Sequence, residues 1–125
     1  MSATNPRYAD ICALLDSLVN WPRDQDILTA PHAMFWRTGN NNQDYVDLAD
    51  FLKITTDSWG PSGNLVTPGN ANQSNLFLAI SGTKPFDGQN GPPQMPDTGN
   101  DPGARHATPD EQTMVKTWIN NGAPA

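Results

Sequence analysis

Cysteine is almost absent from this chain of 125 residues. The single cysteine, Cys12, has no partner within the chain, so an internal disulfide cannot form. It stands in the apolar stretch ICALL, where we expect a small buried hydrophobic side chain rather than a reactive thiol. Two histidines without a cysteine cluster also make a poor zinc site. The sequence therefore predicts no metal centre.

Positive charge is scarce as well. Seven lysines and arginines face thirteen aspartates and glutamates, which gives a formal net charge of −6, and the basic residues form no cluster. Because nucleic acids and anionic membranes are bound through basic surfaces, we expect neither as a partner. The acidic surface is typical of a chain kept in solution by its charge.

Long apolar runs are missing too. No stretch approaches the roughly 18 apolar residues of a membrane-spanning helix. The first residues, MSATNPRYAD, lack the basic segment followed by an apolar segment that marks an export signal. We expect a cytoplasmic protein, or a periplasmic one if a signal peptide has been removed.

The chain has the size of one domain, residues 1–125, and much of it is expected to be loop. Only 36% of its residues are hydrophobic, and it contains 10 glycines and 12 prolines. No alternating strand pattern is visible between the turn signals. The sequence therefore predicts an all-α fold of about four short helices joined by long loops.

The first two helices are predicted over residues 6–20 and 44–54. Asn5 is the expected N-cap of the first helix, with Pro6 at its first position. Its buried stripe comprises Tyr8, Ile11, Leu14, Leu15 and Leu18, while Asp10 and Asp16 are expected to face outward. The segment DYVDLADFLKI predicts the second helix, with its aspartates opposite the apolar stripe.

Two further helices are predicted nearer the end of the chain. Asn72 is a candidate N-cap for a short helix that ends at Gly82. Thr108, Pro109 and Glu111 form a T-x-x-E capping box at the start of the last helix. Between these helices lies a Gly/Pro-rich loop that carries Met95, and His106 near its end is expected to be solvated.

Three segments of the chain resemble small c-type cytochrome domains, in the version common in planctomycete-type proteins. PGNANQSNLFLAISG resembles their segment P-G-[DN]-x-x-x-S-x-L-x-x-x-I-x-G, and QMPDTG resembles the segment whose methionine can be the sixth haem ligand. TPDEQTMVKTWINNGAP resembles their closing helix. The segments occur in family order within residues 65–125. The resemblance implies a cytochrome c-like fold whose N- and C-terminal helices cross, through Tyr8, Ile11, Leu15, Trp118 and Ile119.

The family's haem-attachment motif, C-x-x-C-H, is absent from this chain. With one cysteine, covalent attachment of haem through that motif is impossible. We therefore expect no cofactor. The resemblance then implies a haem-less accessory or protein-binding module, the small partner of a larger oxidoreductase or protein complex. On this hypothesis Met95 fills space that haem would occupy.

Two alternative functions remain open from the sequence. The first is an electron-transfer protein with non-covalent haem, in which Met95 and His32 are the axial ligands. Its pocket would be lined by Phe35, Trp36, Phe77 and Trp118. The second is an enzyme that binds a small molecule in the vacated pocket. No nucleophile motif such as G-x-S-x-G supports catalysis, so an enzyme is the less favoured class.

The tryptophans suggest a protein-binding patch. Trp36 and Trp59, together with Phe35, lie in or near expected loops, and tryptophan is favoured as an anchor at protein interfaces. The competing interpretation is that these rings bury the loops against the helices. A protein partner is expected in the first case.

Overall fold

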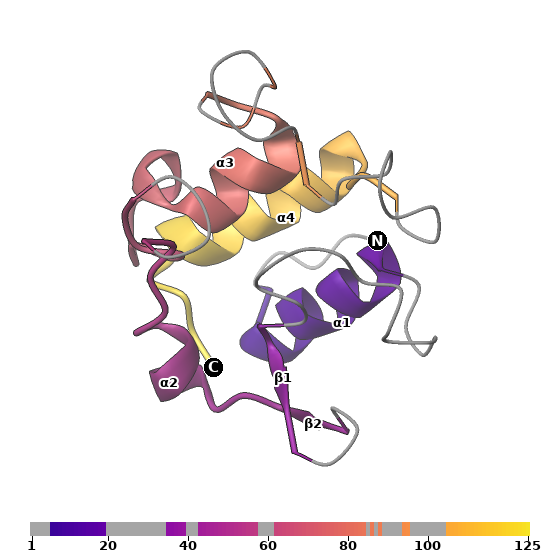
Figure 1. Ribbon diagram of the computed structural model, residues 1–125, viewed down its shortest axis with the longest axis vertical. Coiled ribbons are helices and arrows are strands. Elements are labelled where there is room, and N and C mark those ends of the chain that lie inside the picture. The colour runs from indigo at the N-terminus through magenta and orange to yellow at the C-terminus, as the bar shows by residue number, and fades with distance from the viewer. Residues whose placement is uncertain are drawn as a thin grey trace.

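The computed structural model describes residues 6–19, 35–39, 43–57, 62–84, 86, 88, 94–95 and 105–125. Its elements, in chain order, are α1 (Tyr8–Leu18), β1 (Arg37–Thr38), β2 (Asp44–Tyr45), α2 (Leu48–Phe51), the 3₁₀ turn η3 (Ala71–Gln73), α3 (Asn75–Ser81) and α4 (Pro109–Asn120). Figure 1 shows α3 and α4 side by side, with α1 on the side of α4 away from α3 and the two strands beyond α1.

The all-α prediction is wrong, because β1 and β2 form a small antiparallel sheet. Arg37 pairs with Tyr45, and Thr38 pairs with Asp44. Residues 44–54 were expected to form one helix, but only Leu48–Phe51 is helical. Residues 44–45 instead pair with the chain around Trp36, where the Val46 N–H also donates to the Trp36 carbonyl at 2.9 Å. Tertiary contacts thus override a helical pattern that was too short to decide the structure alone.

The start of α1 also differs from the prediction. The helix begins at Tyr8 with Arg7 as N-cap, and Pro6 lies before it as a fully buried residue. The Arg7 N–H donates to the Asp10 carboxylate at 2.8 Å, which satisfies one of the backbone donors at the helix start. The expected cap, Asn5, lies outside the described residues.

The capping box of α4 is confirmed, whereas the start of α3 moves. The Glu111 N–H donates to Thr108 Oγ1 at 3.2 Å, and the Thr108 N–H donates to Glu111 Oε1 at 2.9 Å. Ser74, not Asn72, precedes α3, since residues 71–73 form the 3₁₀ turn. The expected stop at Gly82 is confirmed by its left-handed backbone, with φ of 68°.

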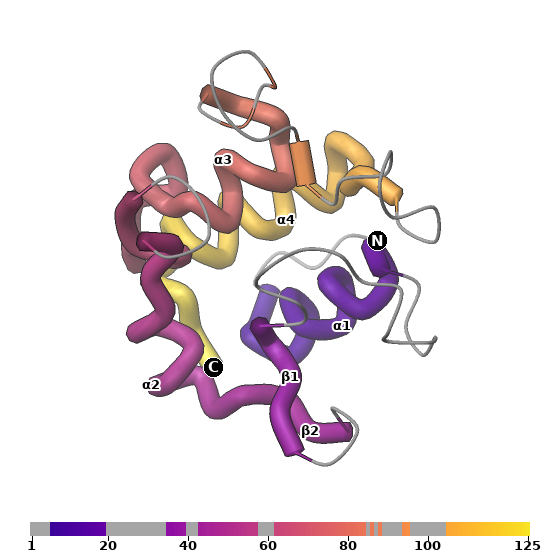
Figure 2. Tube along the Cα trace, viewed as in Figure 1, coloured from indigo at the N-terminus to yellow at the C-terminus, as the bar shows by residue number. Residues whose placement is uncertain are grey.

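One hydrophobic core joins the described elements. It is built from the apolar faces of α1, α3 and α4 and from Trp36, Phe51, Leu65 and Val66. The terminal helices α1 and α4 meet in this core, where Ile11 and Ile119 are fully buried. The segment after α4, the yellow end of the tube in Figure 2, returns to α1: the Pro124 carbonyl accepts a hydrogen bond from the Tyr8 N–H at 3.1 Å.

Within the described part of the chain, every helix is too short or too polar to cross a lipid bilayer.

Candidate functional site

Met95 lies at the C-terminal end of α3 and is half-buried. Its backbone N–H donates to the Ala79 carbonyl at 2.8 Å, and the side-chain amide of Gln94 donates to the Ile80 carbonyl at 2.8 Å. The Ile80 carbonyl, near the end of the helix, gains a partner in this way, whereas the Ala79 carbonyl also accepts from the Gly82 N–H at 3.4 Å. The Gln94–Met95 pair therefore closes the end of α3 through its backbone and amide.

Two of the other residues predicted to act at the site fall outside the described residues. These are His32, the expected axial partner of Met95, and Trp59, an expected anchor of the protein-binding patch. The pairing of His32 with Met95 as axial ligands therefore remains a prediction.

Phe35 and Trp36 are placed together, at the base of β1. Their rings are perpendicular with centroids 5.0 Å apart, and Trp36 is only 3% exposed. The Trp36 indole N–H donates to Asp16 Oδ1 at 2.8 Å, so the ring is fixed by packing and by a hydrogen bond. Phe35 is half-buried against the core. Trp36 is therefore part of the hydrophobic core, and it exposes almost no surface that a protein partner could contact.

Two of the aromatic residues expected to line a haem pocket, Phe35 and Trp118, both contact Phe51, which was not expected there. Phe35 lies 6.1 Å from Phe51, and Phe51 lies 6.3 Å from Trp118, between ring centroids. Tyr8 closes the cluster, 5.1 Å from Phe51 and 6.2 Å from Trp118. A flat macrocycle between two walls needs about 7 Å, twice an ordinary contact distance. Rings already in contact do not leave that space, so these side chains do not fit a haem between them.

Phe77, the fourth residue expected at the pocket, lies on α3 and packs against the core from its edge. The Lys116 ammonium group of α4 lies 6.0 Å from its ring centroid, at the outer limit of a cation–π contact. Phe77 therefore bridges α3 and α4.

The most connected polar group on α1 is the Asp16 carboxylate. Oδ1 accepts from Trp36 Nε1 and from Arg37 Nε, both at 2.8 Å. Oδ2 accepts from Arg37 Nη2 at 2.6 Å and from the Tyr45 hydroxyl at 2.7 Å. The guanidinium thus binds both oxygens of the carboxylate, the strongest geometry for such a pair. The expectation that Asp16 faces outward into solvent is wrong, because its side chain is only 13% exposed.

These contacts determine the charge state of the Asp16 cluster. Burial raises the pKa of Asp16, but hydrogen bonds from Arg37, Trp36 and Tyr45 outweigh it and leave the pKa below its ordinary value. Burial, together with the hydrogen bond to the Asp16 carboxylate, raises the pKa of Tyr45 to about 12. At neutral pH the cluster is therefore a carboxylate, a guanidinium and a neutral phenol.

Cys12 lies between Tyr8 and Asp16 on the same face of α1. It is fully buried, as expected from the sequence, and burial is the main cause that raises its pKa to about 11. The Tyr8 hydroxyl donates to the Val46 carbonyl, next to β2. A thiol with that pKa is protonated at neutral pH and is a weak nucleophile.

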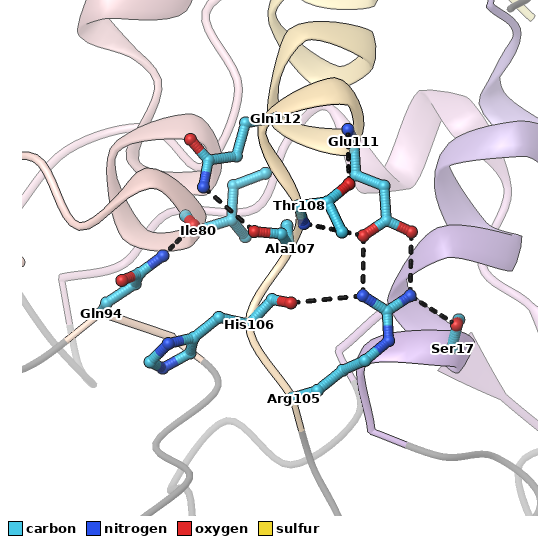
Figure 3. A network of polar contacts seen from close by, with 9 residues as sticks. All are labelled: Ser17, Ile80, Gln94, Arg105, His106, Ala107, Thr108, Glu111 and Gln112. Atoms are coloured by element: carbon cyan, nitrogen blue, oxygen red, sulfur yellow. Dashed lines mark hydrogen bonds and ion pairs between the residues drawn. The ribbon is translucent and has the colours of Figure 1, made fainter.

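A second polar network joins the segment before α4 to α1 (Figure 3). Arg105 donates to both carboxylate oxygens of Glu111, at 2.7 and 2.8 Å, and to Ser17 Oγ at 2.9 Å. Its backbone N–H donates to the Leu18 carbonyl at the end of α1. The hydrogen bond from Arg105 is the main cause that lowers the pKa of Glu111 to about 2. The imidazole of His106 points away from this network and is exposed, as Figure 3 shows.

Sequence reasoning missed the Asp16 cluster, although one signal for it was present. Tyr8, Cys12 and Asp16 are spaced by four residues and so share one face of a helix. A carboxylate in line with a half-buried tyrosine and a buried cysteine needs a hydrogen-bonding partner. No local pattern indicates that the partners are Arg37 and Tyr45.

Metal ligation finds little support in the described residues, which contain no group of three or more histidine, cysteine, aspartate or glutamate side chains able to hold a metal ion. Comparisons of the chain with protein-family models, with curated proteins and with solved structures find no match.

Proposed function

We propose that the chain is a haem-less module related to small c-type cytochrome domains, and that it acts by binding a protein rather than by binding haem. Three family-like segments around residues 68–82, 94–99 and 108–124 support the relationship, and the missing C-x-x-C-H motif supports the haem-less part of the proposal. The proposed role is the small accessory partner of a larger oxidoreductase or complex. That role is inferred by analogy with the family and not from a site.

The contact between Phe35, Phe51 and Trp118 is the observation that carries the haem-less part of the proposal. Phe35 and Trp118 are two of the side chains expected to line a haem pocket, and both contact Phe51 instead. Met95, the counterpart of the family's axial ligand, contributes its backbone N–H to the end of α3. A residue that is held in this way has a structural use that does not depend on haem.

An absorption spectrum of the purified chain, recorded before and after titration with hemin, tests the haem-less part. We expect no Soret band at first and, after hemin, only the spectrum of free hemin. A Soret band that shifts on reduction and disappears in Met95→Ala, but not in Met114→Ala, would overturn the proposal. Met114 is a matched control because it is a half-buried methionine on α4.

The binding role needs a separate experiment. The chain is immobilised and used to capture partners from an extract of its source, and the bound fraction is examined for flavin or haem absorbance. We expect a partner that carries a redox cofactor, and we expect it to be lost when Trp118→Ala unfolds the bait. A bound fraction that is the same on the folded and unfolded baits would contradict the accessory role.

A further inference from the structure

The end of α4 places an asparagine directly before a glycine. The sequence contains two such pairs, Asn121–Gly122 at this helix end and Asn90–Gly91, which lies outside the described residues. In an Asn-Gly pair the glycine backbone nitrogen can attack the side-chain amide carbon of the asparagine, because glycine has no Cβ to hinder the approach. Asparagine is accordingly among the thermolabile residues of proteins. The end of α4 therefore carries the groups needed for a spontaneous modification.

The glycine of this pair suits the backbone at the helix end. Gly122 has φ of 93°, in the left-handed region, and its N–H donates to the Ile119 carbonyl at 2.9 Å. The N–H of Ala123 donates to the Trp118 carbonyl, also at 2.9 Å. These two hydrogen bonds form a Schellman motif, which favours glycine at the position of Gly122. The residue that ends α4 without strain is thus also the residue that leaves the Asn121 amide unhindered.

The folded backbone holds the two reacting groups in an unsuitable arrangement. The ψ angle of Asn121 is 5°, which turns the Gly122 nitrogen toward the backbone nitrogen of Asn121 rather than toward its side chain. Ring closure needs that nitrogen beside the amide carbon, about 3–3.5 Å away and in line with it. Asn121 is exposed and lines an open hollow of about 480 Å³ with Arg7 and Pro124, so solvent reaches it. Backbone rotation, and not access of water, is therefore the barrier that the fold adds.

Residues 122–125, beyond α4, are held by few contacts. Ala123 is the one buried residue among them, and Pro124 is exposed. The Pro124 carbonyl accepts from the Tyr8 N–H at 3.1 Å and from Trp118 Nε1 at 2.8 Å. Segments with few buried apolar contacts open at lower free energy than the core. This segment can therefore detach while α1 and α4 remain packed.

We propose that Asn121 is a deamidation site whose reaction is controlled by the end of α4. Detachment of residues 122–125 breaks the Schellman motif and frees the ψ angle of Asn121. The Gly122 nitrogen then gives its proton to a base in solvent and bonds to Asn121 Cγ, the bond from Cγ to Nδ2 breaks, and ammonia leaves. Water opens the resulting succinimide ring at either of its carbonyls, which leaves aspartate or isoaspartate at this position.

Both products change the end of α4. Each adds one negative charge to the hollow that Arg7 lines. Isoaspartate also adds one carbon atom to the main chain, so the two hydrogen bonds of the Schellman motif lose their register. The isoaspartate product therefore cannot restore the original attachment of residues 122–125.

Peptide mapping by mass spectrometry follows the reaction in the full chain, incubated in mildly alkaline buffer with and without urea. Cleavage after Lys116 releases residues 117–125, and fragment spectra separate Asn121 from its neighbour Asn120. We expect Asn121 to deamidate at least about tenfold more slowly in the native chain than above the unfolding transition, on the order of the two hydrogen bonds that must break. Below the transition the rate should hardly depend on urea, since detachment exposes little surface.

Asn120 is the internal control. It is exposed in the same helical turn, but it precedes an asparagine rather than a glycine, and its Oδ1 accepts the Ala71 N–H at 3.0 Å. It should keep its amide throughout. Equal rates of deamidation at Asn121 in the native and unfolded chains would overturn the proposal. So would a rate in the native chain whose urea dependence equals that of global unfolding.

Two variants test the chemistry and its consequence. Asn121→Gln keeps an exposed amide but places it one methylene further from the backbone, so the mass increase of residues 117–125 should disappear. An increase that persists would overturn the assignment to Asn121. Asn121→Asp carries the charge of the product without the added main-chain atom. We expect the isoaspartate chain, separated by chromatography, to unfold at a lower urea concentration than Asn121→Asp, and equal midpoints would contradict the loss of the Schellman motif.

Discussion

At the scale of single residues, two carboxylates organise much of the described polar structure. Asp16 joins α1 to the β1–β2 strand pair, and Glu111 joins the start of α4 to Arg105. Each receives both nitrogens of an arginine fork, a geometry that favours the ionised form and lowers the pKa of the acid. Asp16 is the more buried of the two, since 26% of the Glu111 side chain remains exposed.

Glu111→Gln is expected to lower the free energy of unfolding at pH 7 by about 1–2 kcal/mol, because it weakens the capping box and removes the ion pair with Arg105. The folded-state pKa of Glu111, about 2, lies below its ordinary value of 4.5. Its contribution is therefore complete above pH 4.5 and is lost as pH falls toward 2. Urea unfolding at several pH values should show the difference between the two chains shrinking over that range.

Asp110→Asn is the control for this experiment, because Asp110 is the exposed neighbour in the same helical turn. It changes the same net charge without touching Arg105. A pH-independent difference between the wild-type chain and Glu111→Gln would contradict the assignment of the low pKa to this pair.

How far each residue's role could be predicted depends on the distance along the chain to its partner. The Thr108–Glu111 box was predictable because both partners lie within one helical turn. The bond from Arg105 to Ser17 spans 88 residues, and no local pattern encodes it. Asp16 was misplaced for the same reason, because its partners Trp36, Arg37 and Tyr45 lie 20, 21 and 29 residues further along the chain.

At the scale of elements, the start of α4 and the end of α3 were predicted, whereas the starts of α1 and α3 were not. Gly82 ends α3 as expected, since a glycine adopts the left-handed backbone without strain. The segment 44–54 was misread because four apolar residues at helical spacing also suit a short strand followed by a turn of helix. The Tyr45 hydroxyl bond to Asp16 favours the second arrangement.

Gly82→Ala tests how Gln94 and Met95 close α3. A Cβ at this position would lie 3.1 Å from the Gln94 side-chain oxygen, and φ of 68° is strained for alanine. We expect the free energy of unfolding to fall by about 1–2 kcal/mol, from backbone strain and from displacement of the Gln94 amide. Thermal and urea unfolding would measure the loss.

Gly122→Ala separates these two causes. Gly122 has φ of 93°, but a Cβ there would meet nothing within 4 Å, so only backbone strain should appear. Gln94→Ala combined with Gly82→Ala should cost less than the sum of the two single changes, because both act on one contact. If the costs of the two single changes simply add in the double variant, the methyl group added at Gly82 does not disturb Gln94.

At the scale of the whole molecule, residues from both ends of the chain meet around Trp118. Its ring is fully buried, contacts Tyr8 and Phe51, and donates from Nε1 to the Pro124 carbonyl at 2.8 Å. The same carbonyl accepts the Tyr8 N–H. The sequence indicated that α1 and α4 would meet, on the strength of the family resemblance, but Phe51 and Pro124 at this junction were not foreseen. Contacts between segments that are distant along the chain produce no periodic pattern in the sequence, so they could not be predicted from it.

Trp118→Phe is therefore expected to weaken the whole fold, and Trp36→Phe should weaken it as well, because both rings are buried in one core. The first change removes the bond to Pro124 and leaves a void in the core, at a cost of about 2–3 kcal/mol. It should shift the urea midpoint without changing the slope of unfolding. The second removes the indole bond to Asp16 and also leaves a void, because Trp36 is only 3% exposed, so it too should lower the urea midpoint. A urea midpoint that stays at the wild-type value in either variant would contradict the assignment of that ring to the core.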